Sequence, residues 1–194
     1  MTVKLIIANV IIFGLTMLSD QLYVALAMVP GYIVYKYWIW QFVTYMFVHG
    51  GFSHLFFNMF GLFVFGSPVE KQLGSKEFLL FYLLTGTFSG IFSFIAYLIA
   101  GVNVVLVGAS GAIFAVMLAF AVFYPHARIF VFGILPVKAP ILVVVYAGIE
   151  LYNQVVGTRA GVAHLTHLAG FGFAYLYMVV RLKINPIKVF LDHR

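Results

Sequence analysis

The chain has 194 residues, of which 64% are hydrophobic, 19% are aromatic and only 8% are charged. Soluble domains carry about 25% charged residues, so this composition excludes a water-soluble globular protein. With a mean hydropathy of +1.11, the net charge of +6 indicates basic loops on a membrane protein rather than a protein that binds nucleic acid.

Long apolar runs predict an all-α polytopic membrane protein with six transmembrane helices, folded as a single domain over residues 1–194. A spanning helix needs about 20 apolar residues, so six helices use about 120 residues and leave only short loops and tails. The six predicted spans cover approximately residues 4–28, 53–69, 78–100, 110–124, 137–156 and 162–182.

Two connecting segments have a distinct composition. Residues 29–52 are rich in Tyr and Trp, which prefer the membrane interface because their rings are apolar with one polar edge. We expect this segment to be a loop in the outer headgroup zone. The second span is expected to end in a charged turn over residues 70–77, and a turn over residues 157–161 separates the last two spans.

The basic residues predict the orientation of the chain, because cytoplasmic loops carry an excess of Lys and Arg. With a cytoplasmic N-terminus, nine of the eleven basic residues lie inside: Lys4, Lys71, Lys76, Arg128, Lys138, Arg181, Lys183, Lys188 and Arg194. Only Lys36 and Arg159 then lie outside. Both termini are therefore expected on the cytoplasmic side.

The fourth predicted span is short. At 1.5 Å per residue it extends about 22 Å, less than the roughly 30 Å of the hydrocarbon core. Its first residue, Ser110, must then lie below the outer surface, and residues 102–109 must enter the membrane as non-helical backbone surrounded by protein or water. Ser110 stands between Gly108-Ala109 and Gly111, beside free backbone N–H groups that favour negative charge. This pattern is typical of a nucleophile, although an N-cap or a packing residue is an alternative reading of Ser110.

The sixth predicted span contains His164 and His167. Ionisable residues within a span are costly and usually face the bundle interior. The face of His167 continues in small residues, and the fourth span has a matching face that would allow close approach. These small residues are Gly170 and Ala174 on the sixth span, and Gly111 and Ala115 on the fourth. The packing would bring His167 to Ser110, whereas His164 is expected at the interface.

The second predicted span begins with further polar residues. His54 and Asn58 lie one turn apart on one helical face, where both can donate hydrogen bonds to an oxyanion. His49 either joins them or holds the glycine-rich loop before the span. The histidines at 49, 54, 164 and 167 offer nitrogen ligands, but no carboxylate accompanies them in sequence, no H-E-x-x-H motif occurs and the chain has no cysteine. We therefore expect no metal.

Taken together, these residues resemble the rhomboid family of intramembrane serine proteases, in order along the chain from about residue 40 to residue 181. The matching motifs are His49…His54-Leu55-Phe56-Phe57-Asn58, Glu70-Lys71-Gln72-Leu73-Gly74, Gly108-Ala109-Ser110-Gly111 and His167-Leu168-Ala169-Gly170. The resemblance implies a six-helix bundle with a short, buried fourth helix.

The resemblance also implies the roles of these residues. Ser110 is the nucleophile and His167 the general base, in a dyad without an acid; no carboxylate lies near His167 in the chain. The oxyanion hole maps to the Ser110 N–H, His54 and Asn58. The supporting residues are His49, Gly108, Gly111, Phe114 and Gly170. No cofactor is implied.

Two positions depart from the family pattern. Trp40-Gln41 replaces a Trp-Arg pair in the first loop, so a guanidinium anchor is missing there. Phe114 occupies the place of a tyrosine that stacks on the base in some members, which preserves stacking but removes a phenolic hydrogen bond. Neither departure changes the dyad.

The function implied is cleavage, near the outer face, of membrane proteins whose transmembrane helices are unstable, by an integral multi-pass protein of a bacterial cytoplasmic (inner) membrane. Its partners are these substrates and the lipid bilayer, without nucleic acid, and the sequence leaves the oligomeric state open. Two alternatives are a catalytically silent protein that binds membrane helices, and a channel or carrier with a histidine-lined cavity. Asp20 and Glu150 lie near the outer ends of spans, where snorkelling or interhelical hydrogen bonds can accommodate them.

Overall fold

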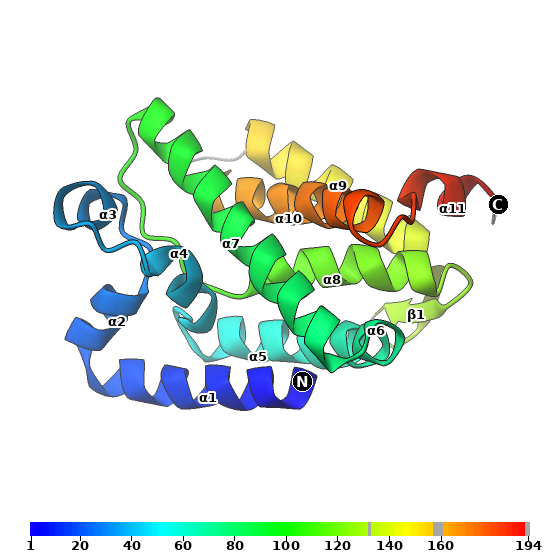
Figure 1. Cartoon of the computed structure of the whole chain (residues 1–194), viewed down its shortest axis with the longest axis horizontal. Coiled ribbons are helices and arrows are strands. Elements are labelled where there is room, and N and C mark those ends of the chain that lie inside the picture. Colours follow the sequence, from blue (N-terminus) through cyan, green and yellow to red (C-terminus); the bar gives the residue numbers. More distant parts are fainter. Residues whose placement is uncertain (132, 157–160, 193–194) are drawn as a thin grey trace.

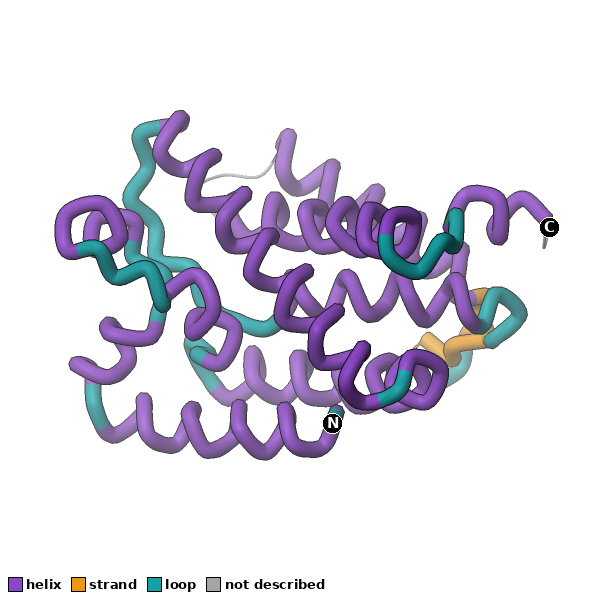
Figure 2. Tube along the Cα trace, in the orientation of Figure 1, coloured by secondary structure: helices purple, strands orange, loops and turns teal. Residues whose placement is uncertain are grey.

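The computed structural model describes residues 1–131, 133–156 and 161–192, with side chains throughout except for residues 161–163. The described chain is a bundle of helices with one small hairpin (Figures 1 and 2). Its elements are α1 (Thr2–Leu18), α2 (Asp20–Leu26), α3 (Pro30–Lys36), α4 (Gln41–Thr44), η1 (Tyr45–Phe47), α5 (Phe52–Gly61), η2 (Leu62–Gly66), α6 (Ser67–Leu73), α7 (Ser75–Ala100), α8 (Ser110–Phe123), β1 (Arg128–Val131), β2 (Leu135–Lys138), α9 (Ala139–Val156), α10 (Gly161–Val180) and α11 (Pro186–Asp192). The mostly helical fold predicted from the sequence is confirmed.

Apolar helices account for all six predicted spans, but with different lengths. Within the described residues, three helices are long and apolar enough to cross a membrane: Phe52–Leu73, Ser75–Ala100 and Ala139–Val156. The first of these is continuous because α5, η2 and α6 follow one another without a break. The shorter apolar helices are Thr2–Leu18, Ser110–Phe123 and His164–Val180.

The bundle places apolar side chains on its outside and polar ones within it. Exposed apolar residues on α1, α5, α7 and α9 include Ile11, Phe60, Ile99 and Val144. Buried polar residues inside the bundle include Asn9, Thr85, Ser89 and Ser93. The Ser89 hydroxyl donates to the Thr85 carbonyl at 2.7 Å. This arrangement suits a lipid environment, where the outside needs no polar groups and the inside must satisfy its own hydrogen bonds.

The expected continuous first span over residues 4–28 is wrong. The chain leaves the helical conformation at Ser19, where φ is −148° and ψ is 106°. The hydroxyl oxygen of Ser19 accepts a hydrogen bond from the Leu22 N–H at 3.2 Å and so caps α2. The cap satisfies a free N–H at the start of a new helix, which makes a break at this position favourable.

Residues 29–52 are not a simple loop, because they contain α3, α4 and η1. Gln41 is fully buried and binds the backbone of α2 and of the residue before α3. Its Oε1 accepts from the Val29 N–H at 3.0 Å, and its Nε2 donates to the Val24 carbonyl at 3.0 Å. The Trp40 indole donates to the Ala25 carbonyl at 2.9 Å. A neutral amide thus anchors this segment without a guanidinium.

The charged turn after the second span is shorter than expected. Pro68 lies within the continuous helix, directly after the π-helical turn η2, where the regular hydrogen-bond pattern is already interrupted, and α6 continues through Glu70 to Leu73. The helix ends at Gly74, whose φ of +79° is a conformation that favours glycine. The turn over residues 70–77 therefore begins four residues later than the charges suggest.

The antiparallel hairpin β1–β2 is a departure from the all-α expectation. Its pairs are Arg128↔Lys138, Ile129↔Val137, Phe130↔Pro136 and Val131↔Leu135. The hairpin occupies the start of the predicted fifth span, so α9 begins at Ala139 rather than at residue 137. Arg159, Arg194 and residues 157–160 of the predicted turn lie outside the described residues.

Candidate active site

Helix α8 lies in the centre of the bundle, with α7, α9 and α10 packed around it. All its residues from Gly111 to Val122 are buried, except the partly buried Phe114. Figure 1 shows that the segment between α7 and α8 runs inward past α4, so that α8 begins inside the molecule rather than at its end. Ser110 is the first residue of α8 and therefore lies below the end of the bundle. The short length of the fourth predicted span leads to the same expectation.

The non-helical segment before α8 has its backbone groups satisfied by other parts of the chain. Leu106 and Met28 exchange two backbone hydrogen bonds, of 2.9 and 3.0 Å. The Gly108 N–H donates to the Tyr45 carbonyl at 2.9 Å. Protein surrounds the segment at these points, which is the condition for non-helical backbone within a membrane.

Gly108 occupies a position at which a side chain would be strained and would displace His54. Its φ is +115°, and a Cβ atom at this position would lie 2.7 Å from Nε2 of His54. The absence of a side chain allows the His54 imidazole to approach the start of α8.

Glycines also bring α8 and α10 into close contact. A Cβ atom on Gly170 would lie 2.2 Å from the carbonyl oxygen of Gly111, and one on Gly111 would lie 3.1 Å from Cγ2 of Thr166. Ala115 is fully buried on the same face of α8. The small residues from which a close helix crossing is predicted therefore do lie where α8 and α10 cross.

This crossing places Ser110 beside His167. The Oγ of Ser110 lies 2.7 Å from Nε2 of His167. The N-cap position of α8 is Ala109, and no side-chain cap hydrogen bond is present there, so Ser110 does not cap the helix. Phe114 stacks on the His167 imidazole, with ring centroids 4.3 Å apart and planes 9° from parallel. The phenyl ring fixes the plane of the imidazole.

His54 and Asn58 line the same cavity as Ser110. The Gly50 N–H donates to Nδ1 of His54, with 3.4 Å between the nitrogens, which favours the neutral tautomer that carries its proton on Nε2 as a donor. One amide hydrogen of Asn58 goes to the His54 carbonyl at 2.8 Å, which leaves the second for another acceptor. The buried His49 ring lies edge-on to His54, with centroids 5.0 Å apart.

The structure adds one residue that sequence reasoning did not place in the site. Glu150 on α9 is only 7% exposed, and its Oε1 lies 3.0 Å from Nδ1 of His167. Its Oε2 is hydrogen-bonded to Nδ1 of His164. The expectation that the dyad has no acidic neighbour is wrong, because Glu150 lies beside His167 in space although not in sequence. A carboxylate in an apolar span needs a partner, and this requirement is the feature of the sequence that could have indicated Glu150 as a site residue.

The same three side chains form a possible ligand set. Glu150, His164 and His167 each offer an atom, and these atoms lie within 4.8 Å of one another. This set differs from the four histidines considered from the sequence, because it includes a carboxylate and omits His49 and His54. Two imidazoles and a carboxylate are a donor set that Zn²⁺ accepts.

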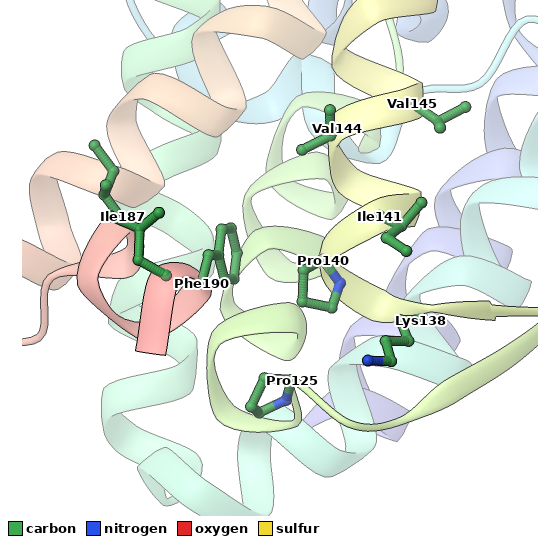
Figure 3. A pocket seen from close by; sticks show the side chains of 9 residues that line it. Pro125, Lys138, Pro140, Ile141, Val144, Val145, Ile187 and Phe190 are labelled. Carbon is green, nitrogen blue, oxygen red and sulfur yellow. The ribbon is translucent and has the colours of Figure 1, made fainter. Parts of the chain in front are cut away.

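Of two cavities in the described part of the structure, one borders the Ser110–His167 pair and the other does not. A cavity of about 590 Å³ borders Ser110, His167, His54 and Asn58, and is otherwise lined mainly by apolar residues of α5, α8, α9 and the hairpin. A second cavity of about 370 Å³ lies between α9 and α11 (Figure 3). Among the described residues lining it, Lys138 is the charged one, beside Pro125, Ile141 and Phe190. The first cavity is therefore the candidate substrate site.

Comparison with known families agrees with this geometry. The rhomboid domain matches residues 37–184, which include every residue of the candidate site. The chain belongs to the rhomboid family. Since the rhomboid domain is polytopic, this chain is a multi-pass membrane protein.

Several rhomboid relatives are similar in sequence. The putative rhomboid protease YdcA of Bacillus subtilis is 40% identical over 75 residues, which is 39% of this chain and 36% of that protein. Rhomboid-like protein 11, chloroplastic, of Arabidopsis thaliana is 36% identical over 98 residues, covering 50% of this chain and 34% of that protein. RHOMBOID-like protein 4 of the same plant is 28% identical over 155 residues, covering 80% and 37%. The chain thus spans little more than a third of the length of these relatives.

Proposed function

We propose that this rhomboid-family protein is a serine intramembrane endopeptidase that cleaves transmembrane segments of membrane proteins near the outer face, with Ser110 as nucleophile and His167 as general base. The observation that carries the proposal is the 2.7 Å contact between Ser110 Oγ and His167 Nε2, at a buried helix start beside a cavity. A nucleophile within hydrogen-bond reach of its base is the arrangement that covalent catalysis requires.

The chemistry proceeds by transfer of an acyl group to Ser110. His167 Nε2 takes the hydroxyl proton as Oγ attacks the scissile carbonyl carbon, and the carbonyl π electrons move to the oxygen. When the tetrahedral intermediate collapses, the C–N bond breaks and the leaving nitrogen takes the proton from Nε2. Water then attacks the ester by the same proton transfers and releases the new carboxyl terminus.

The oxyanion needs donors on the side of Ser110 that faces the cavity. Helix α8 begins at Ser110, so free N–H groups of its first turn are available at this end, and the helix dipole favours negative charge there. His54 Nε2–H and the second amide hydrogen of Asn58 are side-chain donors on residues that line the same cavity as Ser110. We propose that these groups stabilise the intermediate.

The substrate class follows from the cavity. A peptide carbonyl within a helix is bonded and shielded, so a transmembrane segment must unwind before Ser110 can attack it. Segments with helix-weakening residues unwind more easily, and small residues at the cleaved bond fit close to α8. We propose that an unstable substrate helix enters from the lipid and lies in the apolar cavity between α5 and α9.

The proposed location is a bacterial cytoplasmic membrane with both termini inside. This proposal rests on the positions of the basic residues in the sequence.

The deciding experiment is labelling of the purified protein in detergent by a fluorophosphonate serine probe. We expect the parent to be labelled, and Ser110→Ala and His167→Ala to lose both labelling and cleavage of a model membrane substrate while remaining folded. Because the two residues act as a unit, the double variant should be no worse than either single one. Substantial turnover by a well-folded Ser110→Ala protein would overturn the proposal.

The parent and Ser110→Ala proteins also distinguish the proposed function from two other functions. A silent helix-binding protein would bind the substrate without reacting with the probe. A channel or carrier would give flux in vesicles that persists in Ser110→Ala. Neither result is expected if Ser110 is a nucleophile.

A further inference from the structure

We propose that Glu150 is a positioning residue for His167, so that the site operates as Ser110–His167–Glu150 with His164 holding the carboxylate. The inference rests on the proposed protease function and deepens it. It gives a functional role to an acidic residue on α9, a helix that carries neither the nucleophile nor the base.

The position of Glu150 is unlike that of its neighbours on α9. Ile149 is 47% exposed and Leu151 is 57% exposed, whereas Glu150 is 7% exposed. A carboxylate turned into the interior of a membrane bundle loses the stabilisation of water and must be compensated by nearby donors. The two imidazoles of α10 supply that compensation.

The proton on His167 explains what Glu150 can do. Nε2 must present its lone pair to accept the Ser110 proton, so the neutral ring must carry its hydrogen on Nδ1. Oε1 of Glu150, at 3.0 Å, is the acceptor that favours this tautomer. Among the described residues, Nδ1 of His167 has no other hydrogen-bond partner, so the Glu150 carboxylate is the group placed to accept its proton. The carboxylate then stabilises the imidazolium that forms during attack.

His164 fixes the direction of the carboxylate. Its Nδ1 donates to Oε2, which leaves Oε1 facing His167 one turn further along α10. The His164 and His167 rings are edge-to-face, with centroids 6.3 Å apart. Each carboxylate oxygen therefore has one imidazole, and rotation of the Glu150 side chain would break one of the two contacts.

A metal ion on the same three residues would have the opposite effect. An ion bound to Nδ1 of His167 takes that lone pair, so the proton of the neutral ring must sit on Nε2. Nε2 would then donate to Ser110 instead of accepting its proton. The positioning role and a metal role are mutually exclusive, and a chelator therefore distinguishes them.

The test compares turnover by the protein in proteoliposomes for the parent, Glu150→Gln and Glu150→Asp. Glu150→Gln keeps the size of the side chain but removes the charge, and we expect kcat to fall by about 10²- to 10⁴-fold with little change in KM. Glu150→Asp keeps the charge but draws it back by one methylene, so part of the activity should return. Asp20→Asn, which removes an exposed carboxylate from α2, is the matched control and should keep parental kcat and KM.

A second readout follows the tautomer directly. In protein labelled with ¹⁵N-histidine, the His167 signals of the parent should show a protonated Nδ1 and a free Nε2, and those of Glu150→Gln should shift toward a mixture of tautomers. A residue that only packs α9 against α10 would change the thermal unfolding temperature without this shift. Thermal unfolding of each variant therefore accompanies the kinetics.

The outcomes separate this inference from the function on which it rests. If the parent reacts with the fluorophosphonate probe and folded Glu150→Gln and Glu150→Asp both keep parental kcat, the positioning role is overturned and the protease function stands. If chelation abolishes activity and Zn²⁺ restores it, the positioning role is also overturned. If the parent does not react with the probe at all, the protease function fails and this inference fails with it.

Discussion

His54 and His167 both line the cavity at Ser110, but their Nε2 atoms have opposite hydrogen-bonding roles. His54 receives the Gly50 N–H at Nδ1, so its Nε2 is a donor toward the cavity. His167 presents Nε2 to the Ser110 hydroxyl and Nδ1 to the Glu150 carboxylate, so its Nε2 is an acceptor. In each imidazole, the hydrogen-bond partner of Nδ1 determines whether Nε2 donates or accepts a proton.

The donors to the oxyanion can be tested apart from the nucleophile. Asn58→Ala and His54→Ala should each lower kcat with little effect on KM, because neither residue activates Ser110. The loss of a well-aimed donor costs about 2.7–4 kcal/mol, and less where water replaces it. Asn58→Asp should be at least as harmful, since a carboxylate repels an oxyanion. Kinetics of each variant, with thermal unfolding as control, check this; parental kcat in Asn58→Asp would make Asn58 a packing residue.

Removal of metal ions tests the other chemistry open to the histidines. We expect protease activity to survive prolonged dialysis against strong chelators, because Ser110, His167 and hydrogen-bond donors suffice for the mechanism. The measurement is the rate of substrate cleavage before and after dialysis. A loss reversed by Zn²⁺ would instead assign Glu150, His164 and His167 as its ligands.

At the scale of the elements, the site depends on how closely α8 and α10 approach. Gly170 lies directly against the Gly111 carbonyl, so the two backbones are in contact where Ser110 and His167 meet. Small residues permit this contact because lipid provides little other driving force for helix association than close packing. The third partner, Glu150, arrives from α9, which packs on both α8 and α10.

A single methyl group at this crossing should separate the dyad. Gly170→Ala would place its Cβ 2.2 Å from a backbone oxygen, which cannot move aside as a side chain can, so α10 must shift and carry His167 with it. We expect a stability loss of about 1–3 kcal/mol and a strong loss of probe labelling. Gly172→Ala is the matched control, because a Cβ there meets nothing within 4 Å. Equal labelling rates for the two variants would contradict a role for this contact.

At the scale of the whole molecule, the depth of Ser110 depends on which end of the bundle faces outward. Helix α8 is short and begins inside the bundle, while exposed apolar side chains cover the outer helices. The site is thus inside the molecule and open to a cavity lined mainly by apolar groups. This depth gives proteolysis near one face of the membrane only if the orientation proposed from the basic residues holds.

Reporter fusions test that orientation. Fusions after residues 36 and 159 should report the outside, and fusions after residues 73, 130 and 194 the inside, because nine of the eleven basic residues then face the cytoplasm. Paired reporters, one active on each side, give a positive signal at every site. An outside C-terminus would mean that the number of spans is wrong, and the proposed cleavage near the outer face would fail with it.

The sequence by itself determined the membrane class, the family and the pairing of Ser110 with His167, because composition, apolar runs and glycine spacing are local properties. It did not determine the break at Ser19 or the hairpin β1–β2, since a polar cap and a strand pair can interrupt an apolar run without changing its composition. Only the tertiary structure brought Glu150 to His167. These residues lie on different helices, and the contact between them depends on how α9 packs against α10; the sequence indicates that Glu150 needs a partner but not which residue provides it.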